Sequence, residues 1–242
     1  MVDKTISLSM KSKDKLYNGI ITISDCPFER LREIRKDFLH MEEEMVFNSY
    51  PFQSRQFSYL QGKYSAKKAL SALLNVPPGE ILIDSGIFFQ PIVKTEMPSH
   101  VKISVSHSKN ISVGFAFDER ILAGIDVEFN NHSKNWVELI SATDEEKKLS
   151  YELSENQHIL FWCSKESLAK ALQIGFTSDL QIFEINGIRK TENYVEVSFR
   201  FFPHFKSYVF MNENFCIAIA LPGNIDLDSS EILEIGHEIT GF

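Results

Sequence analysis

Residues 161–172 read FWCSKESLAKAL and lie in the strongest helical pattern of the chain. Within this stretch Trp162, Glu166 and Lys170 are spaced i, i+4 and i+8, so a helix places them on one stripe. An adjacent apolar stripe, which buries the helix, is formed by Phe161, Leu168 and Leu172. An isolated Glu–Lys pair at this spacing is an ordinary surface pair worth roughly 0.3–0.5 kcal/mol. Beside an apolar stripe and a tryptophan, the same pair is less readily explained as a solvated surface pair.

Capping signals mark the limits of this helix. The sequence Ser154-x-x-Gln157 forms a capping box, and the pattern predicts a helix over residues 155–173 that Gly175 stops. A second capping box at residues 143–146 begins a shorter helical region upstream, with acidic residues in its first turn.

Apolar alternation and turn residues predict the elements on either side. The expected helices cover residues 27–46, capped by Asp25, and 57–74, ended by Asn75 and a Pro-Pro-Gly segment. The expected strands are one that ends near Ser24 and the stretches 101–105, 111–117, 121–128, 180–185, 194–202, 208–210 and 215–221. The stretches 111–117 and 121–128 are predicted to pair as an antiparallel hairpin. The tail from Asp226 is acidic and is expected to be peripheral.

Composition indicates a protein with a packed core. The chain of 242 residues has 25 Lys and Arg against 33 Asp and Glu, a net charge of −8, and 43% of its residues are apolar. This length fits either one large domain or two small halves. A weak repeat, in which helices precede an antiparallel hairpin, and the lack of a Gly, Ser or Pro-rich linker favour two packed α+β halves.

The same figures exclude several classes of protein. No apolar run approaches the roughly 18 residues of a membrane helix, and the first residues lack the pattern of a signal peptide. Three widely separated cysteines argue against a disulfide framework or a structural zinc site, and for a reducing cytoplasm. A net charge of −8 argues against a nonspecific nucleic-acid coat.

Residues 123–128, Ala-Gly-Ile-Asp-Val-Glu, contain the first candidate site. On a strand Asp126 and Glu128 point to the same face, because successive side chains alternate. Two neighbouring carboxylates repel each other unless a cation lies between them, and hard oxygen ligands suit Mg²⁺ bound jointly with phosphates. The alternative is a strand with one solvated acidic face.

Two further stretches suit phosphate groups. His107, flanked by Ser106 and Ser108 at a strand end, has donors for a phosphate, although a turn that caps its own backbone is an equal alternative. Lys63, Lys67 and Lys68, with Arg55 upstream, form a basic helical face for a phosphate monoester. A solvated lysine face is the alternative.

Together these residues resemble a known family. Gly-Ile-Asp-Val-Glu at 124–128, followed about forty residues later by Trp-x-x-Lys-Glu-x-x-x-Lys at 162–170, resembles the paired signature of the 4′-phosphopantetheinyl transferases. Residues 106–108 resemble the Ser-His-Ser patch of that family, and residues 62–67 resemble its Gly-Arg-x-x-x-Lys segment. The motifs are in order from about Arg55 onward.

The length of the chain is similar to that of the longer, monomeric class, which includes the surfactin-synthetase-activating enzymes and serves nonribosomal peptide and polyketide synthases. Two departures stand out. The family often has Gly-Lys-Pro where this chain has Phe89-Gln90-Pro91, and Lys63 stands where arginine is more usual. Lysine keeps the charge but loses the planar fork of arginine.

The resemblance implies that the phosphopantetheine arm of coenzyme A is transferred to a serine of an apo acyl or peptidyl carrier protein, with release of 3′,5′-ADP. Asp126, Glu128 and Glu166 would hold Mg²⁺ with the pyrophosphate. Glu166 would also be the general base, and Lys170 would stabilise the leaving phosphate. Coenzyme A would be bound by Arg55, Lys63, Gln90, Pro91, Ser106 and His107.

The resemblance also implies an organisation. Two similar α+β halves, 1–120 and 121–242, would be related by a pseudo-twofold axis, with coenzyme A in the cleft between them. The first half would bind the phosphates, and the second would contain the metal ligands and the catalytic helix. We therefore expect a cytoplasmic monomer that acts on coenzyme A and a carrier protein of fatty acid, polyketide or peptide synthesis, without nucleic acid or membrane as partner.

Two other functions remain open on the sequence. One is a different Mg²⁺-dependent phosphoryl or nucleotidyl transferase built on the same acidic strand. The other is a non-catalytic relative that binds coenzyme A or a carrier protein. Such a relative is expected to have lost a metal ligand or the base, and this chain retains both.

Overall fold

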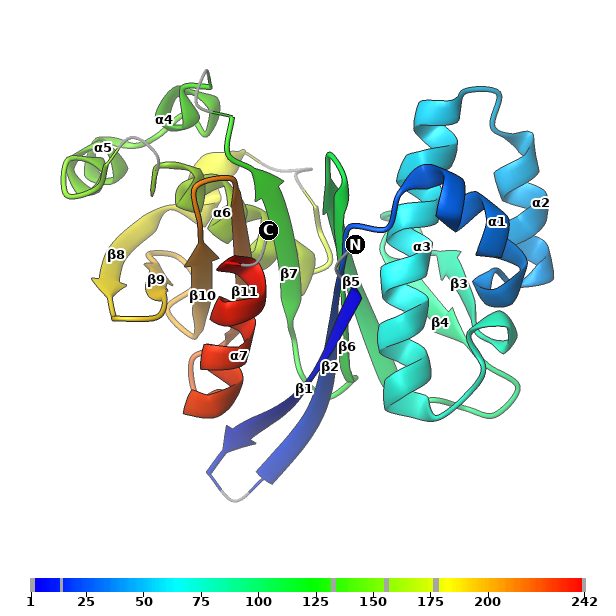
Figure 1. Ribbon diagram of the computed structural model, residues 1–242. Helices are drawn as coiled ribbons and strands as arrows, with labels where there is room; N and C mark the ends of the chain where they lie inside the picture. The colour runs from blue at the N-terminus through cyan, green and yellow to red at the C-terminus, as the bar shows by residue number, and fades with distance from the viewer. Residues whose placement is uncertain (1–2, 14, 132–133, 155–156, 176–178, 241–242) are drawn as a thin grey trace. The chain divides into compact units, whose positions relative to one another are not determined.

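The computed structural model describes residues 3–13, 15–131, 134–154, 157–175 and 179–240 (Figure 1). The chain forms two compact units: unit 1 is Met1–Ser9 with Tyr17–Arg120, and unit 2 is Met10–Leu16 with Ile121–Phe242. The short Met10–Leu16 segment belongs to unit 2, where Lys11 and Asp226 exchange two backbone hydrogen bonds of 3.0 and 2.9 Å. Helices and antiparallel sheets occur in both units, which confirms the α+β class.

Unit 1 consists of a long helix packed on an antiparallel sheet. Its elements are β1 (Asp3–Ser12), β2 (Lys15–Ser24), α1 (Phe28–Phe38), α2 (Met41–Ser49), α3 (Gln53–Leu74), the 3₁₀ helix η1 (Pro78–Glu80), β3 (Leu82–Ser85), β4 (Pro91–Lys94), β5 (Val101–Ser108) and β6 (Ile111–Asp118). The sheet order is β1-β2-β6-β5, and β3 and β4 form a separate pair. Helix α3 packs on β6 and β5. The contact is close because Gly114 lies against the backbone of Ser65 and Ala66.

The first two helices were predicted as one, and this was wrong. Helix α1 ends at Phe38, and α2 begins after His40, whose side chain accepts a hydrogen bond from the backbone N–H of Glu42. The carboxylate of Glu43 accepts a hydrogen bond from the backbone N–H of His40, so the two form a capping box that starts a new helix. The residue that caps α1 is Pro27, not Asp25.

Unit 2 also places a long helix on an antiparallel sheet. Its elements are β7 (Gly124–Phe129), α4 (Trp136–Leu139), α5 (Asp144–Ser150), α6 (Ile159–Ala171), the 3₁₀ helix η3 (Leu180–Phe183), β8 (Ile185–Lys190), β9 (Val195–Phe199), β10 (Phe205–Met211), β11 (Phe215–Pro222) and α7 (Ser229–Thr240). The sheet order is β7-β11-β10-β9-β8. Helix α6 packs on β7, β11 and β10, and α7 lies beside β10 (Figure 1).

The central helix and its neighbours agree in part with the sequence patterns. The capping box from Thr143 to Glu146 is present at the start of α5. Residues 155–156, where the long helix was predicted to start, lie outside the described residues. Helix α6 begins at Ile159, after His158, and ends at Ala171, two residues earlier than expected. Helix α3 ends at Leu74, and Asn75 adopts the left-handed conformation of a helix C-terminus, as expected.

Three predictions from residue 111 onward were wrong. Strand β6 pairs with β5 and β2, whereas β7 pairs with β11, so 111–117 and 121–128 do not form a hairpin. Residues 180–183 form a 3₁₀ helix, and the strand begins at Ile185. The acidic tail forms α7, in which Ile232 and Ile235 are buried, because its apolar residues recur at helical spacing.

The two units share an order of elements. In each, a strand (β2 or β7) precedes a short helix (α2 or α5), a long helix (α3 or α6), a 3₁₀ helix and four strands. This order is the structural form of the weak repeat in the sequence. None of the helices in the described part of the chain has the length and apolarity to span a bilayer.

Candidate functional site

Strand β7 and helix α6 bring the predicted acidic and basic residues together in unit 2. Nζ of Lys170 lies 2.7 Å from Oδ1 of Asp126 and 3.3 Å from Oε1 of Glu166. The two elements come close because Gly124 has no side chain. A Cβ at this position would meet the backbone of Ser167, Lys170 and Ala171. The side chain of Asp126 is 2% exposed, whereas those of Glu166 and Lys170 are 28% and 22% exposed. The group is therefore largely buried but open to solvent on one side.

Burial and neighbouring charges shift the pKa values of this group. Burial, together with the charges of Asp126 and Glu128, raises the pKa of Glu166 to about 7, although Lys170 opposes the shift. Burial lowers the pKa of Lys170, but Asp126 and Glu166 raise it by more, so its net pKa is above the usual value. Near neutral pH Lys170 is therefore charged, and Glu166 can both accept and release a proton.

Glu128 lies at the edge of the same group. Strand alternation places it on the same face of β7 as Asp126. Its Oε1 is 3.8 Å from Nζ of Lys134, which lies 4.7 Å from the ring centroid of Trp136. The ring of Trp136 packs at 6.3 Å from that of Trp162, one helical turn before Glu166. The two tryptophan rings therefore pack together beside Lys134, the partner of Glu128.

The donor set of this group fits a hard divalent cation. Asp126, Glu128 and Glu166 are three carboxylates with two ammonium groups nearby, those of Lys170 and Lys134. Carboxylate oxygens are the ligands that Mg²⁺ prefers. Burial, and then the charges of Asp126 and Glu128, raise the pKa of Glu166, and a divalent cation would favour its charged form. Among the described residues, however, no group of three His, Cys, Asp or Glu side chains is arranged to hold a metal ion. Instead, the ammonium of Lys170 contacts two of the carboxylates.

The basic residues predicted to bind coenzyme A lie in unit 1, on α3. Arg55 is exposed in the first turn, with its guanidinium carbon 5.2 Å from the ring centroid of Tyr50. Lys63 is only 15% exposed: its Nζ lies 3.0 Å from Oε1 of Glu43 and donates a hydrogen bond to the carbonyl of Ile83. Lys63 is therefore engaged inside the unit, and its phosphate-binding role stays a prediction.

The other predicted residues lie on two segments of unit 1. Gln90 belongs to the turn before β4, where its Oε1 accepts a hydrogen bond of 2.9 Å from the backbone N–H of Phe88, and Pro91 is the first residue of β4. Ser106 is buried and His107 is exposed near the end of β5. His107 is on the same face of β5 as Val105, which lies beside Gly62 of α3.

A solvated lysine face on α3 is not observed. Lys67 is fully buried, and its Nζ lies 2.7 Å from Oε2 of Glu43. Lys68 is paired with Asp3 at 2.6 Å. A similar buried pair in unit 2 joins Lys165 to Glu146 at 2.8 Å. These pairs were missed because their acidic partners are distant in sequence, although Glu146 is the third helical residue of a recognised capping box.

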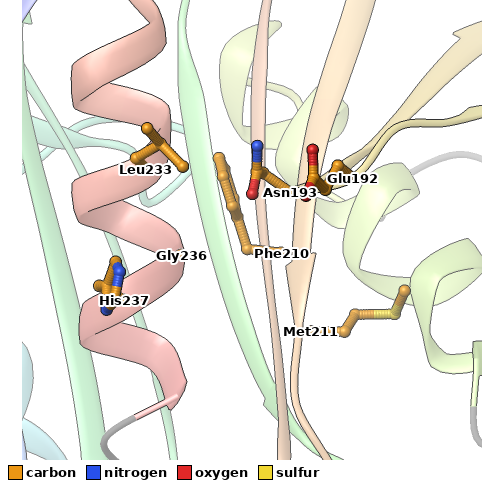
Figure 2. A pocket seen from close by; sticks show the side chains of 7 residues that line it. All are labelled: Glu192, Asn193, Phe210, Met211, Leu233, Gly236 and His237. Atoms are coloured by element: carbon orange, nitrogen blue, oxygen red, sulfur yellow. The ribbon is translucent and has the colours of Figure 1, made fainter.

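A cavity of about 270 Å³ lies elsewhere in unit 2 (Figure 2). Its lining residues are Leu233, Gly236 and His237 of α7, Phe210 and Met211 of β10, and Glu192 and Asn193 of the turn between β8 and β9. None of these seven residues belongs to the predicted site. The cavity therefore adds nothing to the carboxylate group of β7 and α6.

One family matches part of the chain. Residues 123–220, less than half of the chain, match the model of the 4′-phosphopantetheinyl transferase superfamily. The matched range includes β7 and α6, and therefore the whole group of Asp126, Glu128, Glu166 and Lys170. No curated protein was found to match the chain.

Two solved structures resemble about half of the chain. A crystal structure of a holo-(acyl-carrier-protein) synthase from Bacillus anthracis, in complex with CoA (3′,5′-ADP), is 19% identical with a TM-score of 0.35, and the match covers 48% of this chain and 97% of that one. The holo-ACP-synthase from Plasmodium yoelii is 16% identical with a TM-score of 0.35, and the match covers 49% of this chain and 97% of that one.

Proposed function

We propose that this protein is a 4′-phosphopantetheinyl transferase. It transfers the 4′-phosphopantetheine group of coenzyme A to a serine of an apo acyl or peptidyl carrier protein. The observation that carries the proposal is the group of Asp126, Glu166 and Lys170, in which Glu166 has a pKa of about 7. This group lies within the range that matches the superfamily model.

In the proposed reaction the serine hydroxyl oxygen forms a bond to the β-phosphorus of coenzyme A. The bond between that phosphorus and the bridging oxygen breaks, and 3′,5′-ADP leaves with the bonding electrons. Glu166, as the general base, takes the proton of the serine hydroxyl. Its pKa near neutrality suits this role, because a much stronger acid would accept the proton poorly.

Lys170 stabilises the departing phosphate. Its raised pKa keeps the ammonium charged, so it can act as a fixed positive charge beside the oxygen on which negative charge develops. Asp126, almost fully buried, holds Lys170 at 2.7 Å and so fixes its direction. The part of this arrangement that acts on substrate is the half-buried edge formed by Glu166 and Lys170.

Asp126, Glu128 and Glu166 are the proposed ligands of Mg²⁺. When bound, Mg²⁺ neutralises charge on the pyrophosphate oxygens. Lys170 already contacts Asp126 and Glu166, so its positive charge partly neutralises these two carboxylates before the cation and the substrate bind. The net charge of this set is negative without the cation, which favours cation binding.

Unit 1 is proposed to supply the contacts to coenzyme A. Arg55 and His107 are exposed and offer donors for phosphate oxygens. Ser106, Gln90 and Pro91 are assigned to the same ligand by position in the motifs. Lys63 is the weakest member of this set, because its ammonium is held by Glu43. We further propose that the protein acts as a monomer of the longer class, which light scattering in solution would test.

Incubation of the protein with coenzyme A, Mg²⁺ and a panel of apo carrier proteins tests the proposal. Intact mass spectrometry is expected to show a gain of one phosphopantetheine group on a carrier, and 3′,5′-ADP is expected as the second product. Omission of Mg²⁺ with added chelator is expected to stop the gain. A carrier whose target serine is replaced by alanine is the matched control.

Two outcomes would contradict the proposal. Binding of coenzyme A or a carrier without any mass gain across the panel would indicate a non-catalytic binding protein. Transfer of a phosphoryl or nucleotidyl group in place of phosphopantetheine would indicate a different Mg²⁺-dependent transferase on the same acidic strand.

A further inference from the structure

The lysine next to Glu166 has no access to substrate. The side chain of Lys165 is 0% exposed, and its Nζ lies 2.8 Å from Oε1 of Glu146 on α5. The same ammonium donates a hydrogen bond of 3.0 Å to the carbonyl oxygen of Leu180 on η3. A fully enclosed ammonium cannot contact a phosphate group in this conformation. Lys165 therefore needs a role different from that of Lys170.

The partner of Lys165 is itself fixed by the backbone. Oε1 of Glu146 accepts a hydrogen bond of 2.9 Å from the N–H of Ile185, at the start of β8. Its Oε2 accepts one of 3.1 Å from the N–H of Thr143, which caps α5. Three segments of unit 2 thus meet at one buried ion pair, and α6 is joined to all of them through Lys165.

This junction limits how α6 can rotate about its axis. Consecutive residues of a helix point about 100° apart, so the direction of Lys165 determines that of Glu166 and, one turn later, of Lys170. We propose that Lys165 and Glu146 are positioning residues that hold α6 in the rotation at which Glu166 and Lys170 face Asp126. The inference rests on the proposed function, since it assigns these two residues a part in the same reaction.

Unit 1 contains a matched pair without a catalytic group beside it. Lys67 of α3 is fully buried, and its Nζ lies 2.7 Å from Oε2 of Glu43. Glu43 accepts hydrogen bonds of 2.9 Å each from the N–H groups of Ile83 and His40. The same substitutions therefore remove the same kind of buried ion pair from each unit. Only in unit 2 is the buried lysine followed by the proposed base, Glu166.

The experiment compares two double variants that replace each buried pair by neutral residues of similar size. For Glu146→Gln with Lys165→Met, we expect kcat for carrier modification to fall by about 10²-fold, while KM for coenzyme A changes by less than about threefold, since misplacement of a reacting group lowers the rate of the chemical step. For Glu43→Gln with Lys67→Met, we expect KM for coenzyme A to change rather than kcat. The reason is that Glu43 also holds Lys63, which is proposed to bind coenzyme A.

A spectroscopic readout follows the position of α6 without any need for activity. The chain has two tryptophans, Trp136 and Trp162, whose rings pack at 6.3 Å, and Trp162 is on α6. With 5-fluorotryptophan, the ¹⁹F spectrum has two lines, which Trp162→Phe assigns. The unit 2 double variant is expected to shift the Trp162 line, and the unit 1 double variant is expected to leave both lines at their wild-type positions.

A gentler substitution keeps the test decisive if the double variant does not fold. Glu146→Asp retains the charge but shortens the side chain by one methylene, so it draws Lys165 and α6 toward α5. We expect a smaller shift of the Trp162 line and a smaller loss of kcat, with Glu43→Asp as the control. Wild-type kcat and unchanged lines in the folded unit 2 variants would show that the pair is only structural and overturn the inference. A wild-type protein that modifies no carrier would overturn the proposed function instead, while the ¹⁹F lines would still test the position of α6.

Discussion

Unit 1 and unit 2 each pair a glutamate from the first turn of a short helix with a fully buried lysine of the long helix. In unit 1 the pair is Glu43 with Lys67, and in unit 2 it is Glu146 with Lys165. Both glutamates also accept a backbone hydrogen bond from the strand that follows the 3₁₀ helix. The duplicated pair joins the same kinds of element in both units and is therefore a feature of the shared scaffold.

The units differ in the residues that follow this lysine. In unit 1 the next residue is Lys68, which is paired with Asp3. In unit 2 it is Glu166, which faces Lys170 and Asp126. The same arrangement of elements thus contains a simple ion pair at this position in unit 1 and a group of strongly interacting charges in unit 2.

The adjoining strands differ in the same way. On its helix-facing side β2 has Ile20, Thr22 and Ser24, where β7 has Gly124, Asp126 and Glu128. Asp and Glu equal Lys and Arg in number within unit 1, so the whole excess of negative charge lies in unit 2. The comparison shows that packing is common to both units, whereas the acidic chemistry is specific to one.

Replacement of the proposed base should give the largest effect. Glu166→Gln keeps the size of the side chain but removes the proton acceptor, so we expect turnover to fall by about 10²–10⁴-fold. Coenzyme A binding is expected to stay near wild type, which calorimetry can measure. Wild-type turnover in this variant would remove the main functional difference between the units.

Single substitutions of the buried lysines should separate the two ion pairs. Lys165→Met leaves the carboxylate of Glu146 buried and unpaired, which is expected to lower the free energy of unfolding by about 3–5 kcal/mol. Lys67→Met should lower it by only about 1–2 kcal/mol, because Lys63 remains 3.0 Å from Glu43. Urea denaturation of both variants measures the difference, and equal losses would show that Lys63 does not compensate.

The two units are also expected to respond to pH in opposite directions. The pKa of Glu166 is raised from 4.5 to about 7, so the folded state binds the proton more tightly and loses stability as pH rises through this range, by about 3 kcal/mol at most. Burial raises the pKa of Glu43, but Lys63 and Lys67 outweigh it and lower the pKa overall. Its contribution to stability is therefore present above pH 4.5 and is lost as pH falls below it.

Denaturation of the metal-free protein from pH 3 to pH 8 tests these signs. Glu166→Gln should abolish the decline above pH 4.5, and Glu43→Gln should weaken the decline at acid pH. Added Mg²⁺ should also reduce the decline above pH 4.5, because a bound cation favours the charged carboxylate. A stability curve that Glu166→Gln leaves unchanged would contradict the assignment.

Substitution of the two packing glycines should give smaller effects than loss of Lys165. A Cβ at Gly124 meets the backbone of α6, and a Cβ at Gly114 meets the backbone of α3, so Gly→Ala should cost about 1–3 kcal/mol at either position. Because Gly124→Ala also moves α6 away from β7, it should lower turnover by more than its loss of stability explains. Equal effects on turnover would indicate that the spacing of α6 and β7 has no special importance.

The sequence predicted a feature well where the signal lies within a single helix or strand. The end of α3 at Leu74, the capping box of α5 and the shared stripe of Trp162, Glu166 and Lys170 follow from spacing along one element. The break between α1 and α2 was missed, because His40 is an unusual capping residue and Glu43 satisfies both its own helix and a distant strand. The strand partner of β7 was also wrong, since pairing with β11 joins residues almost a hundred positions apart.

By itself, the sequence determined the α+β class and the set of charged residues on β7 and α6. Periodicity of two or 3.6 residues places side chains on faces without any knowledge of the remaining chain. Only the tertiary structure decided which charges meet. It showed that Lys170 contacts both Asp126 and Glu166, that Lys67 and Lys165 are buried in ion pairs, and that Lys63 is paired with Glu43. The physical reason is that burial and charge pairing depend on contacts between distant segments, which set the pKa and the role of each group.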